Sequence, residues 1–222
     1  MTQSETQKQQ QGIKKTLIVI GCFIVVVFGL FVNRLSMDRI LSPKELVANG
    51  AIMFSSPREI GEFDLLDHNE MEFTKLQLKG QWSLVFFGFT HCPDICPTTL
   101  AMMNKLAEFL VDTDYAVDTQ FLMVSLDPAR DKPEILKPYV EYFNTEFIGV
   151  TGEFLSIHRL VKQLNVAFQK VVTNAETGEY TVDHSGHIAL INPAGHYNGF
   201  FKPPLDVDRM LMTYKSIRAS AQ

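Results

Sequence analysis

Two of the three cysteines lie close together in the stretch FFGFTHCPDICPTTL, residues 86–100. Three residues separate Cys92 from Cys96, whereas redox-active pairs are usually separated by two. On a helix, a separation of four positions places both side chains on one face, about 6 Å apart along the axis. Such a pair could form a disulfide, exchange disulfides with another protein, or share a soft metal ion: Cu(I), zinc or the iron of an Fe–S cluster.

The elements around the pair favour chemistry over a simple cross-link. The apolar run WSLVFFGF, residues 82–89, predicts a strand that is buried on both faces. Apolar positions in residues 98–110 recur with the spacing of an amphipathic helix. The pair therefore lies between the end of a strand and the start of a helix, where free N–H groups and positive potential favour thiolates. We expect lowered thiol pKa values there.

A metal site would require a further ligand, because two cysteines alone complete neither a zinc nor an Fe–S site. The segment YTVDHSGH, residues 180–187, contains His184 and His187 three positions apart. In an extended segment an odd separation places the two rings on opposite faces, so at most one of them can reach the cysteines. Asp183 could hydrogen-bond to a ligating His184. The spacing does not choose between the two histidines.

The composition excludes several other classes of protein. The chain has 222 residues and a net charge of −5, and residues 1–33 contribute +2 to it, which leaves −7 for the remaining 189. An acidic domain without a basic run is a poor binder of nucleic acid, so we expect no nucleic-acid partner. Only two cysteines follow residue 33, too few for a disulfide-stapled scaffold.

An apolar segment near the N-terminus predicts a membrane anchor. Residues 16–32 (TLIVIGCFIVVVFGLFV) carry no charge and reach the lower length limit of a membrane span. Lys14 and Lys15 precede the segment and favour a cytoplasmic N-terminus. A lipoprotein is the alternative, since residues 19–22 (VIGC) loosely resemble a lipidation site at Cys22. A cleaved signal peptide is disfavoured because no small-residue cleavage site follows.

These patterns divide the chain into four parts. We expect a cytoplasmic tail at 1–15, a transmembrane anchor at 16–33, a tether at 34–57 with a short helix near 43–49, and a folded domain at 58–222. Strands and helices alternate in the domain, which predicts one α/β domain with a mixed sheet flanked by helices. The expected strands are 61–66, 72–78, 82–89, 119–126, 147–150, 166–173, 180–183, 188–192 and 197–201, and the expected helices are 98–110, 131–144, 153–164 and 206–219.

The chain resembles the Sco/SenC family of membrane-anchored, thioredoxin-fold copper proteins that serve cytochrome c oxidase assembly. The resemblance extends over residues 58–215 and is carried by FFGFTHCPDICPTTL, SLDPARDKPEIL (125–136), FIGVTG (147–152) and YTVDHS (180–185). It implies a thioredoxin-like fold, copper ligation by Cys92, Cys96 and His184, and a place near the site for Asp127. The stretch ALINPAG (189–195) departs from the family pattern, and His187 and His196 are additional, which concerns the partner surface rather than the ligands.

Two main functions follow from the resemblance. The first is a metallochaperone that delivers copper to the binuclear site of cytochrome c oxidase subunit II. The second is a thiol-disulfide oxidoreductase that acts on the cysteines of exported client proteins and does not require a metal. Reductants of the thioredoxin type would return its own cysteine pair to the dithiol state. A peroxidase that uses Cys92 would require an arginine partner, and the sequence assigns none. We expect the protein to be located in the bacterial inner membrane, with its folded domain in the periplasm. The alternative location is the mitochondrial inner membrane.

Overall fold

The computed structural model describes the backbone of residues 3–36 and 39–221. Residues 1–2, 37–38 and 222, which fall in the expected tail, tether and domain end, lie outside the described residues. The chain divides into two compact units, Met1–Arg39 and Ile40–Gln222. The helices are α1 (Gln3–Ser36), α2 (Pro43–Ala48), α3 (Ile95–Leu110), α4 (Pro133–Phe143), α5 (Phe154–Gln163) and α6 (Val207–Ser220). The strands are β1 (Ala51–Glu59), β2 (Leu65–Asp67), β3 (Glu72–Phe73), β4 (Trp82–Gly88), β5 (Thr119–Ser125), β6 (Ile148–Thr151), β7 (Phe168–Asn174), β8 (Glu179–His184), β9 (Ile188–Ile191) and β10 (His196–Phe201).

The first unit is a single helix in the described residues. Helix α1 contains the window Lys14–Phe31, which is long and apolar enough to cross a membrane, with a mean hydropathy of 2.2. The helix also includes part of the polar segment that we expected to be a separate tail. Glutamine, glutamate and lysine are good helix formers, which explains why the helix begins well before the apolar residues.

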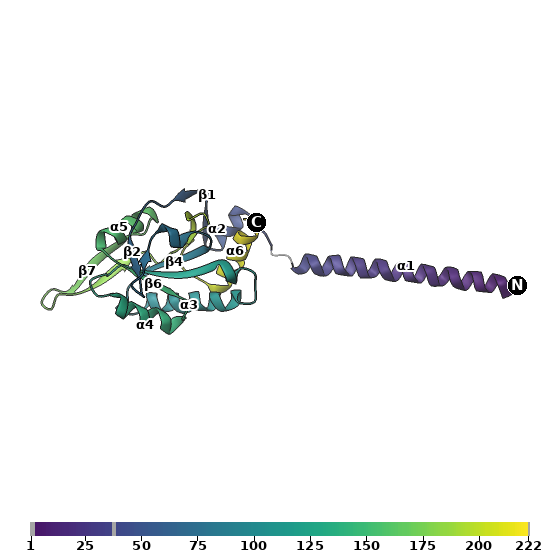
Figure 1. The fold of residues 1–222 in the computed structure, drawn as a ribbon, viewed down its shortest axis with the longest axis horizontal. Coiled ribbons are helices and arrows are strands. Elements are labelled where there is room, and N and C mark those ends of the chain that lie inside the picture. Colours follow the sequence, from purple (N-terminus) through teal and green to yellow (C-terminus); the bar gives the residue numbers. More distant parts are fainter. Residues whose placement is uncertain (1–2, 37–38, 222) are drawn as a thin grey trace. The chain divides into compact units, whose positions relative to one another are not determined.

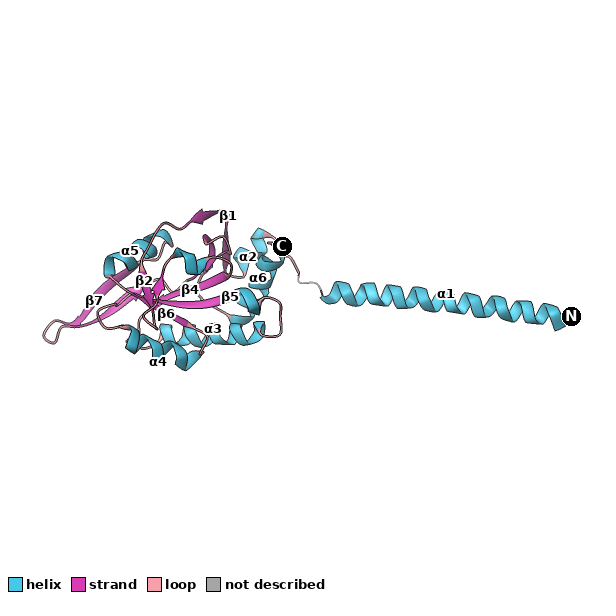
Figure 2. Ribbon diagram, viewed as in Figure 1, coloured by secondary structure: helices cyan, strands magenta, loops and turns pink. Residues whose placement is uncertain are grey.

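The second unit is built on a mixed sheet of eight strands (Figures 1 and 2). The strand order is β1-β10-β9-β4-β5-β6-β2-β3, in which β4, β5 and β6 are parallel and the remaining neighbours are antiparallel. Helices α3 and α4 lie along one side of this sheet and α5 along the other (Figure 1). All seven residues of β4 are buried, as the continuous apolar run predicts. The α/β class with a mixed sheet is confirmed.

The hairpin β7-β8 stands apart from this sheet. Its strands pair only with each other in the described chain and form a separate two-stranded ribbon. The ribbon projects from the unit beside α5 and carries His184 at the end of β8 (Figure 1). Since a two-stranded hairpin alone is marginally stable, side-chain contacts with the rest of the unit must hold it in place.

The structure differs from the expected tether at 34–57. The compact unit begins at Ile40, α2 follows at once with a capping box between Ser42 and Glu45, and β1 pairs with β10. Strand β1 is an edge strand with a register shift between Met53 and Arg58, where Pro57 lies. A proline and mostly exposed positions are typical of edge strands and hide the alternation of a strand in the sequence.

Two short strands also differ from their expected ranges. The segment before Leu65 is irregular, and of the first expected strand, 61–66, only the last two residues lie in β2. The second ends at Phe73, because Thr74 and Gln77 form a capping box that begins a 3₁₀ helix, Lys75–Leu78. Local side-chain capping competes with strand pairing at this point.

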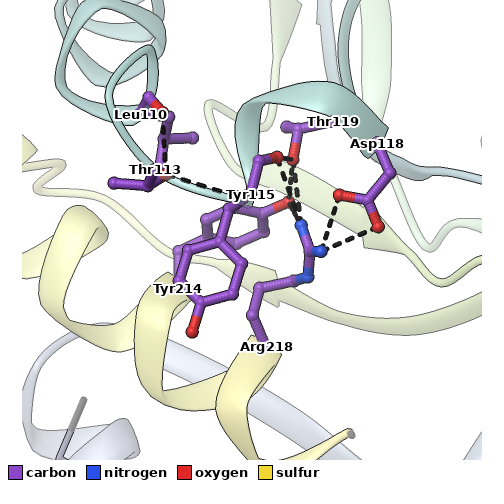
Figure 3. A network of polar contacts seen from close by, with 7 residues as sticks. All are labelled: Leu110, Thr113, Tyr115, Asp118, Thr119, Tyr214 and Arg218. Atoms are coloured by element: carbon purple, nitrogen blue, oxygen red, sulfur yellow. Dashed lines mark hydrogen bonds and ion pairs between the residues drawn. The ribbon is translucent and has the colours of Figure 1, made fainter. Parts of the chain in front are cut away.

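Arg218 of α6 links the C-terminal helix to the end of the sheet at which β4 and β5 begin (Figure 3). Its side chain is buried and donates to both carboxylate oxygens of Asp118, at 2.6 and 2.7 Å. It also donates to the hydroxyls of Thr119 and Tyr214, each at 3.1 Å. The guanidinium lies 5.6 Å from the ring centroid of Trp82, the first residue of β4. This network lies at the opposite end of β4 from the cysteine pair.

Candidate metal centre

The cysteines lie in the connection between β4 and α3, as the sequence predicts. Cys92 precedes the helix and is 9% exposed, whereas Cys96 is the second residue of α3 and is fully buried. The N–H of Cys96 donates to Cys92 Sγ at 3.4 Å. A free N–H at the helix start therefore points at the Cys92 sulfur, and this contact stabilises negative charge there. Both cysteines are free thiols in the structure.

The expectation of a lowered pKa is wrong for Cys96. Burial raises the pKa of the Cys96 thiol, and the hydrogen bond with Cys92 and the negative charges of Cys92 and Asp131 act in the same direction. The backbone hydrogen bond from Phe89 opposes this and is the weaker effect. The sequence places Cys96 at a helix N-terminus, but only the tertiary structure shows that its sulfur faces the core, where a thiolate loses its hydration.

His184 completes a cluster with the two cysteines. Its Nε2 lies 3.5 Å from Cys96 Sγ, and its Nδ1 lies 3.2 Å from the carbonyl oxygen of Ser185. A carbonyl only accepts, so we place the proton on Nδ1, which leaves the Nε2 lone pair directed at the sulfurs. Burial lowers the pKa of His184, which keeps the imidazole neutral at pH 7. Phe86 and Phe89 flank the ring at centroid distances of 6.0 and 6.1 Å.

The three donor atoms fit a single ion. Cys92 Sγ, Cys96 Sγ and a ring nitrogen of His184 all lie within 4.8 Å of one another. With metal–sulfur bonds of about 2.3 Å and metal–nitrogen bonds of about 2.0 Å, a shared ion requires donors at most about 4.6 Å apart. For three donors at trigonal angles around one ion, these bond lengths place the two sulfurs about 4.0 Å apart, so the set would contract by up to about 0.8 Å on binding. Two thiolates and an imidazole are ligands that suit Cu(I).

His187 lies elsewhere. It is buried against Phe200, with a ring centroid distance of 5.1 Å, and its Nε2 has no hydrogen-bond partner in the described part of the chain. The opposite-face argument therefore agrees with the structure, and the geometry selects His184 where spacing did not. The other histidines are also outside the cluster: His68 accepts from the N–H of Gly149 at 2.9 Å, His91 lies on the surface, and His158 and His196 belong to α5 and β10.

The two acidic residues named from the sequence occupy different environments. Asp127 is buried, accepts from the Tyr180 hydroxyl at 2.9 Å and pairs with Arg130. It therefore contacts the hairpin that carries His184 rather than the histidine itself. Asp183 is exposed and acts on His184 through its charge, which opposes the effect of burial on the pKa. The imidazole proton is accepted by the Ser185 carbonyl, so the hydrogen bond that we expected from Asp183 is not formed.

Several residues at the site escape the sequence reasoning. Gly88 ends β4, and a Cβ atom there would lie 3.1 Å from Cys96 Sγ, so the glycine makes room for the sulfur. The helix expected at 131–144 begins only at Pro133, and Asp131 before it is completely buried. Arg130 pairs with Asp127 and lies 3.9 Å from the centroid of the Tyr180 ring. These roles depend on contacts between distant segments.

An open groove of about 490 Å³ gives access to the centre. Its lining includes Cys92 and His184 but not Cys96, so the first cysteine and the histidine face the outside. Apolar side chains make most of the rim, together with two acidic groups. The lining residues are Phe89, Cys92, Pro93, Asp94, Ile95, Val171, Thr181, Val182, Asp183 and His184.

Comparison with known families shows to which family the chain belongs. The family model described as SCO1/SenC matches residues 54–219. The chain belongs to the SCO1/SenC family. A relative from Stutzerimonas stutzeri is 37% identical over 187 residues, which cover 83% of this chain and 88% of the relative. The resemblance read from the sequence motifs is thereby confirmed.

Solved structures of the family share the fold. ScoI from Arabidopsis thaliana with copper bound superposes with a TM-score of 0.65 at 32% identity, over 71% of this chain and 97% of that one. Yeast Sco1 with copper bound gives a TM-score of 0.64 at 31% identity, over 75% of this chain and 90% of that one. The thioredoxin-like fold that the resemblance implied is confirmed, and both of these related structures contain copper.

Proposed function

We propose that this protein carries one copper ion between Cys92, Cys96 and His184 and delivers it to thiolates of a partner protein. The observation that carries the proposal is the convergence of two sulfurs and one neutral imidazole nitrogen within 4.8 Å. Soft ligands of this kind select Cu(I), and copper is bound in two related structures. The family resemblance supports the binuclear copper site of cytochrome c oxidase subunit II as the client.

The accessibility of the site supports a carrier rather than a permanent metal site. Cys92 and His184 line the groove, while Cys96 is buried behind them. A client thiolate that enters the groove could bond to the ion as His184 leaves, and the cysteines could then be displaced in turn. The apolar rim would exclude water during the exchange, and the ion would keep soft ligands throughout.

A direct test is titration of the reduced full chain with Cu(I) in detergent, with a chelator as competitor. We expect one ion per chain and copper absorption edges that report two sulfurs and one nitrogen. Cys92→Ser and Cys96→Ser should each weaken binding by at least tenfold, and a peptide with two cysteines should withdraw the ion from the wild-type protein. If each of the two serine variants still binds one Cu(I) ion with the affinity of the wild type, the proposal is contradicted.

A second function, as a thiol-disulfide oxidoreductase, is favoured by the N–H of Cys96 that points at Cys92 Sγ. The Cys92 thiolate would attack a client disulfide and release one client thiolate. The Cys96 sulfur would then attack the mixed disulfide, releasing the second client thiolate. Two electrons pass from the pair to the client, and a thioredoxin-type reductant must restore the dithiol. His184→Ala discriminates the functions, because it removes a copper ligand and leaves both sulfurs.

The N-terminal unit supports a place in a membrane. We propose that residues 16–33 anchor the protein in a bacterial inner membrane, with the tail 1–15 in the cytoplasm and the copper-binding domain in the periplasm. The apolar window of α1 and the two lysines before its hydrophobic run support this orientation. Membrane fractionation with protease added to intact spheroplasts tests it, since only a periplasmic domain is then degraded. Protection of the domain, or its release by carbonate washing, would overturn the proposal.

A further inference from the structure

One loop contacts both halves of the metal centre. Residues Asp127–Asp131 follow β5 and lie between the turn that carries Cys92 and the hairpin that carries His184. The two halves reach the centre from segments that are far apart in the sequence, and the hairpin belongs to its own small sheet. Because the loop contacts both halves, it can determine the distance between the cysteine turn and the hairpin.

The first arm of the loop is Asp131, which holds the cysteine turn. Its carboxylate is completely buried and accepts from the N–H of Thr90 at 3.0 Å and from the Thr90 hydroxyl at 2.5 Å. The Ser125 hydroxyl, at the end of β5, donates to the same carboxylate at 2.6 Å. Thr90 lies two residues before Cys92. Three donors thus fix the backbone of the turn to the end of the sheet, and removal of the carboxylate would leave buried donors unpaired.

The second arm is the contact of Asp127 and Arg130 with Tyr180 of β8. The Tyr180 hydroxyl donates to Asp127, and the guanidinium of Arg130 both pairs with Asp127 and stacks on the Tyr180 ring. Lys170 of β7 covers the ring, with its Nζ 3.5 Å from the centroid. Tyr180 lies four positions before His184 on the same strand. Since alternate residues of a strand share a face, Tyr180 and His184 are presented on the same side of β8.

We propose that the loop Asp127–Asp131 is a clamp that sets the distance between the cysteine pair and His184, with Tyr180 and Asp131 as its positioning residues. The inference rests on the proposed function where it concerns copper, but the clamp itself is a property of the metal-free protein. A ligand set is useful only when its members are held at bonding distance, and partners outside the ligands supply this restraint.

The hairpin arm is tested in the metal-free, reduced full chain by Tyr180→Phe. This change removes one hydroxyl and keeps the ring between its two cations. We expect amide hydrogen exchange in residues 179–184 to accelerate by about tenfold, since a hydrogen bond to a charged group is lost. Tyr142→Phe, at a tyrosine of α4 that is 83% exposed, is the matched control and should change nothing. Unchanged exchange in Tyr180→Phe would overturn this arm.

The cysteine arm is tested by Asp131→Asn and by the milder Thr90→Val, which keeps the backbone N–H and removes the hydroxyl. We expect both to accelerate exchange of the Thr90 amide and its neighbours in the turn, and the double variant to show less than the summed effect because the two groups share one contact. Asp114→Asn, at an exposed aspartate after α3, is the control. If Asp131→Asn does not fold, Thr90→Val alone decides this arm, and unchanged exchange in it is then the contradicting result.

Copper binding separates this inference from the proposed function. Tyr180→Phe should weaken Cu(I) binding by about tenfold and lengthen or remove the nitrogen contribution in X-ray absorption, with both sulfurs retained. A purely structural role would leave that signature unchanged. If the wild type binds copper with two sulfurs and one nitrogen and Tyr180→Phe is identical to it, the clamp is refuted and the carrier stands. If the wild type binds no copper while exchange changes as expected, the carrier fails and the clamp stands.

Discussion

His184 Nε2 lies 3.5 Å from Cys96 Sγ, although 88 positions separate the two residues in the chain. The contact joins the end of a hairpin strand to the first turn of α3. It converts a dithiol, which could serve disulfide exchange alone, into a three-donor set that suits a soft ion. The relationship is therefore the structural basis of the proposed carrier function, and the following predictions depend on it and on its surroundings.

Replacement of His184 and replacement of His187 by alanine should have unequal effects on the affinity for Cu(I). His184→Ala removes a donor atom, and we expect Cu(I) affinity to fall by at least tenfold in competition with a chelator. His187→Ala removes a buried ring that packs against Phe200 and is not part of the cluster, so it should lower stability and leave the affinity nearly unchanged. The reverse order of affinities would show that the third ligand is assigned incorrectly.

Gly88→Ala should displace the Cys96 sulfur, which lies next to the end of β4. The added Cβ atom would lie 2.8 Å from the Phe86 ring, 3.1 Å from Cys96 Sγ and 3.3 Å from Met123 Cε. Overpacking of this kind costs about 1–3 kcal/mol, and we expect the free energy of unfolding in urea to fall by that amount together with copper affinity. Gly29→Ala in α1, where the new Cβ meets nothing within 4 Å, is the control. Full copper affinity in Gly88→Ala would show that the sulfur does not depend on this glycine.

The metal-free domain should lose stability as pH falls below about 6.5. Burial lowers the pKa values of His184 and His187 in the folded state, whereas both groups titrate near 6.5 when unfolded. The unfolded chain therefore binds more protons below that pH, and the stability that is present above pH 6.5 declines as pH falls toward the folded pKa values. Urea unfolding between pH 8 and 5.5 measures this. A double alanine variant should show a flatter profile, and an equally steep one would assign the effect to other groups.

Arg218→Met should destabilise the domain without altering copper binding. The substitution leaves the Asp118 carboxylate without its guanidinium donor and removes one donor each from the hydroxyls of Thr119 and Tyr214, which stay hydrogen-bonded to each other at 2.6 Å (Figure 3). Loss of one partner of a buried pair costs about 3–5 kcal/mol, and the partial exposure of Asp118 reduces this to about 2–4 kcal/mol. Since the network and the metal centre lie at opposite ends of β4, folded Arg218→Met should bind Cu(I) like the wild type. A large loss of affinity at temperatures where it is folded would show that the two ends are coupled.

Much of the fold could be read from local patterns. The buried strand at residues 82–88, the amphipathic α3, the two hairpins and the apolar N-terminal helix all have strong periodicity or length signals, and these elements appear close to their expected places. The start of the domain could not be read in this way. Edge strand β1 has five exposed residues in succession and a proline, so it carries no alternation, and only its pairing with β10 makes it a strand.

For the metal centre, the sequence by itself determined the chemistry: two cysteines at a strand-to-helix connection, a choice of two histidines in one extended segment, and motifs that identify the family. The tertiary structure decided which nitrogen meets the sulfurs, because the direction of a ring depends on how the hairpin packs against the rest of the domain. It also reversed the expected direction of the Cys96 pKa, because a helix N-terminus is a local feature whereas burial of a sulfur depends on the whole fold. Residue types and spacing specify which ligands are available, and long-range packing determines their distances and their proton affinities.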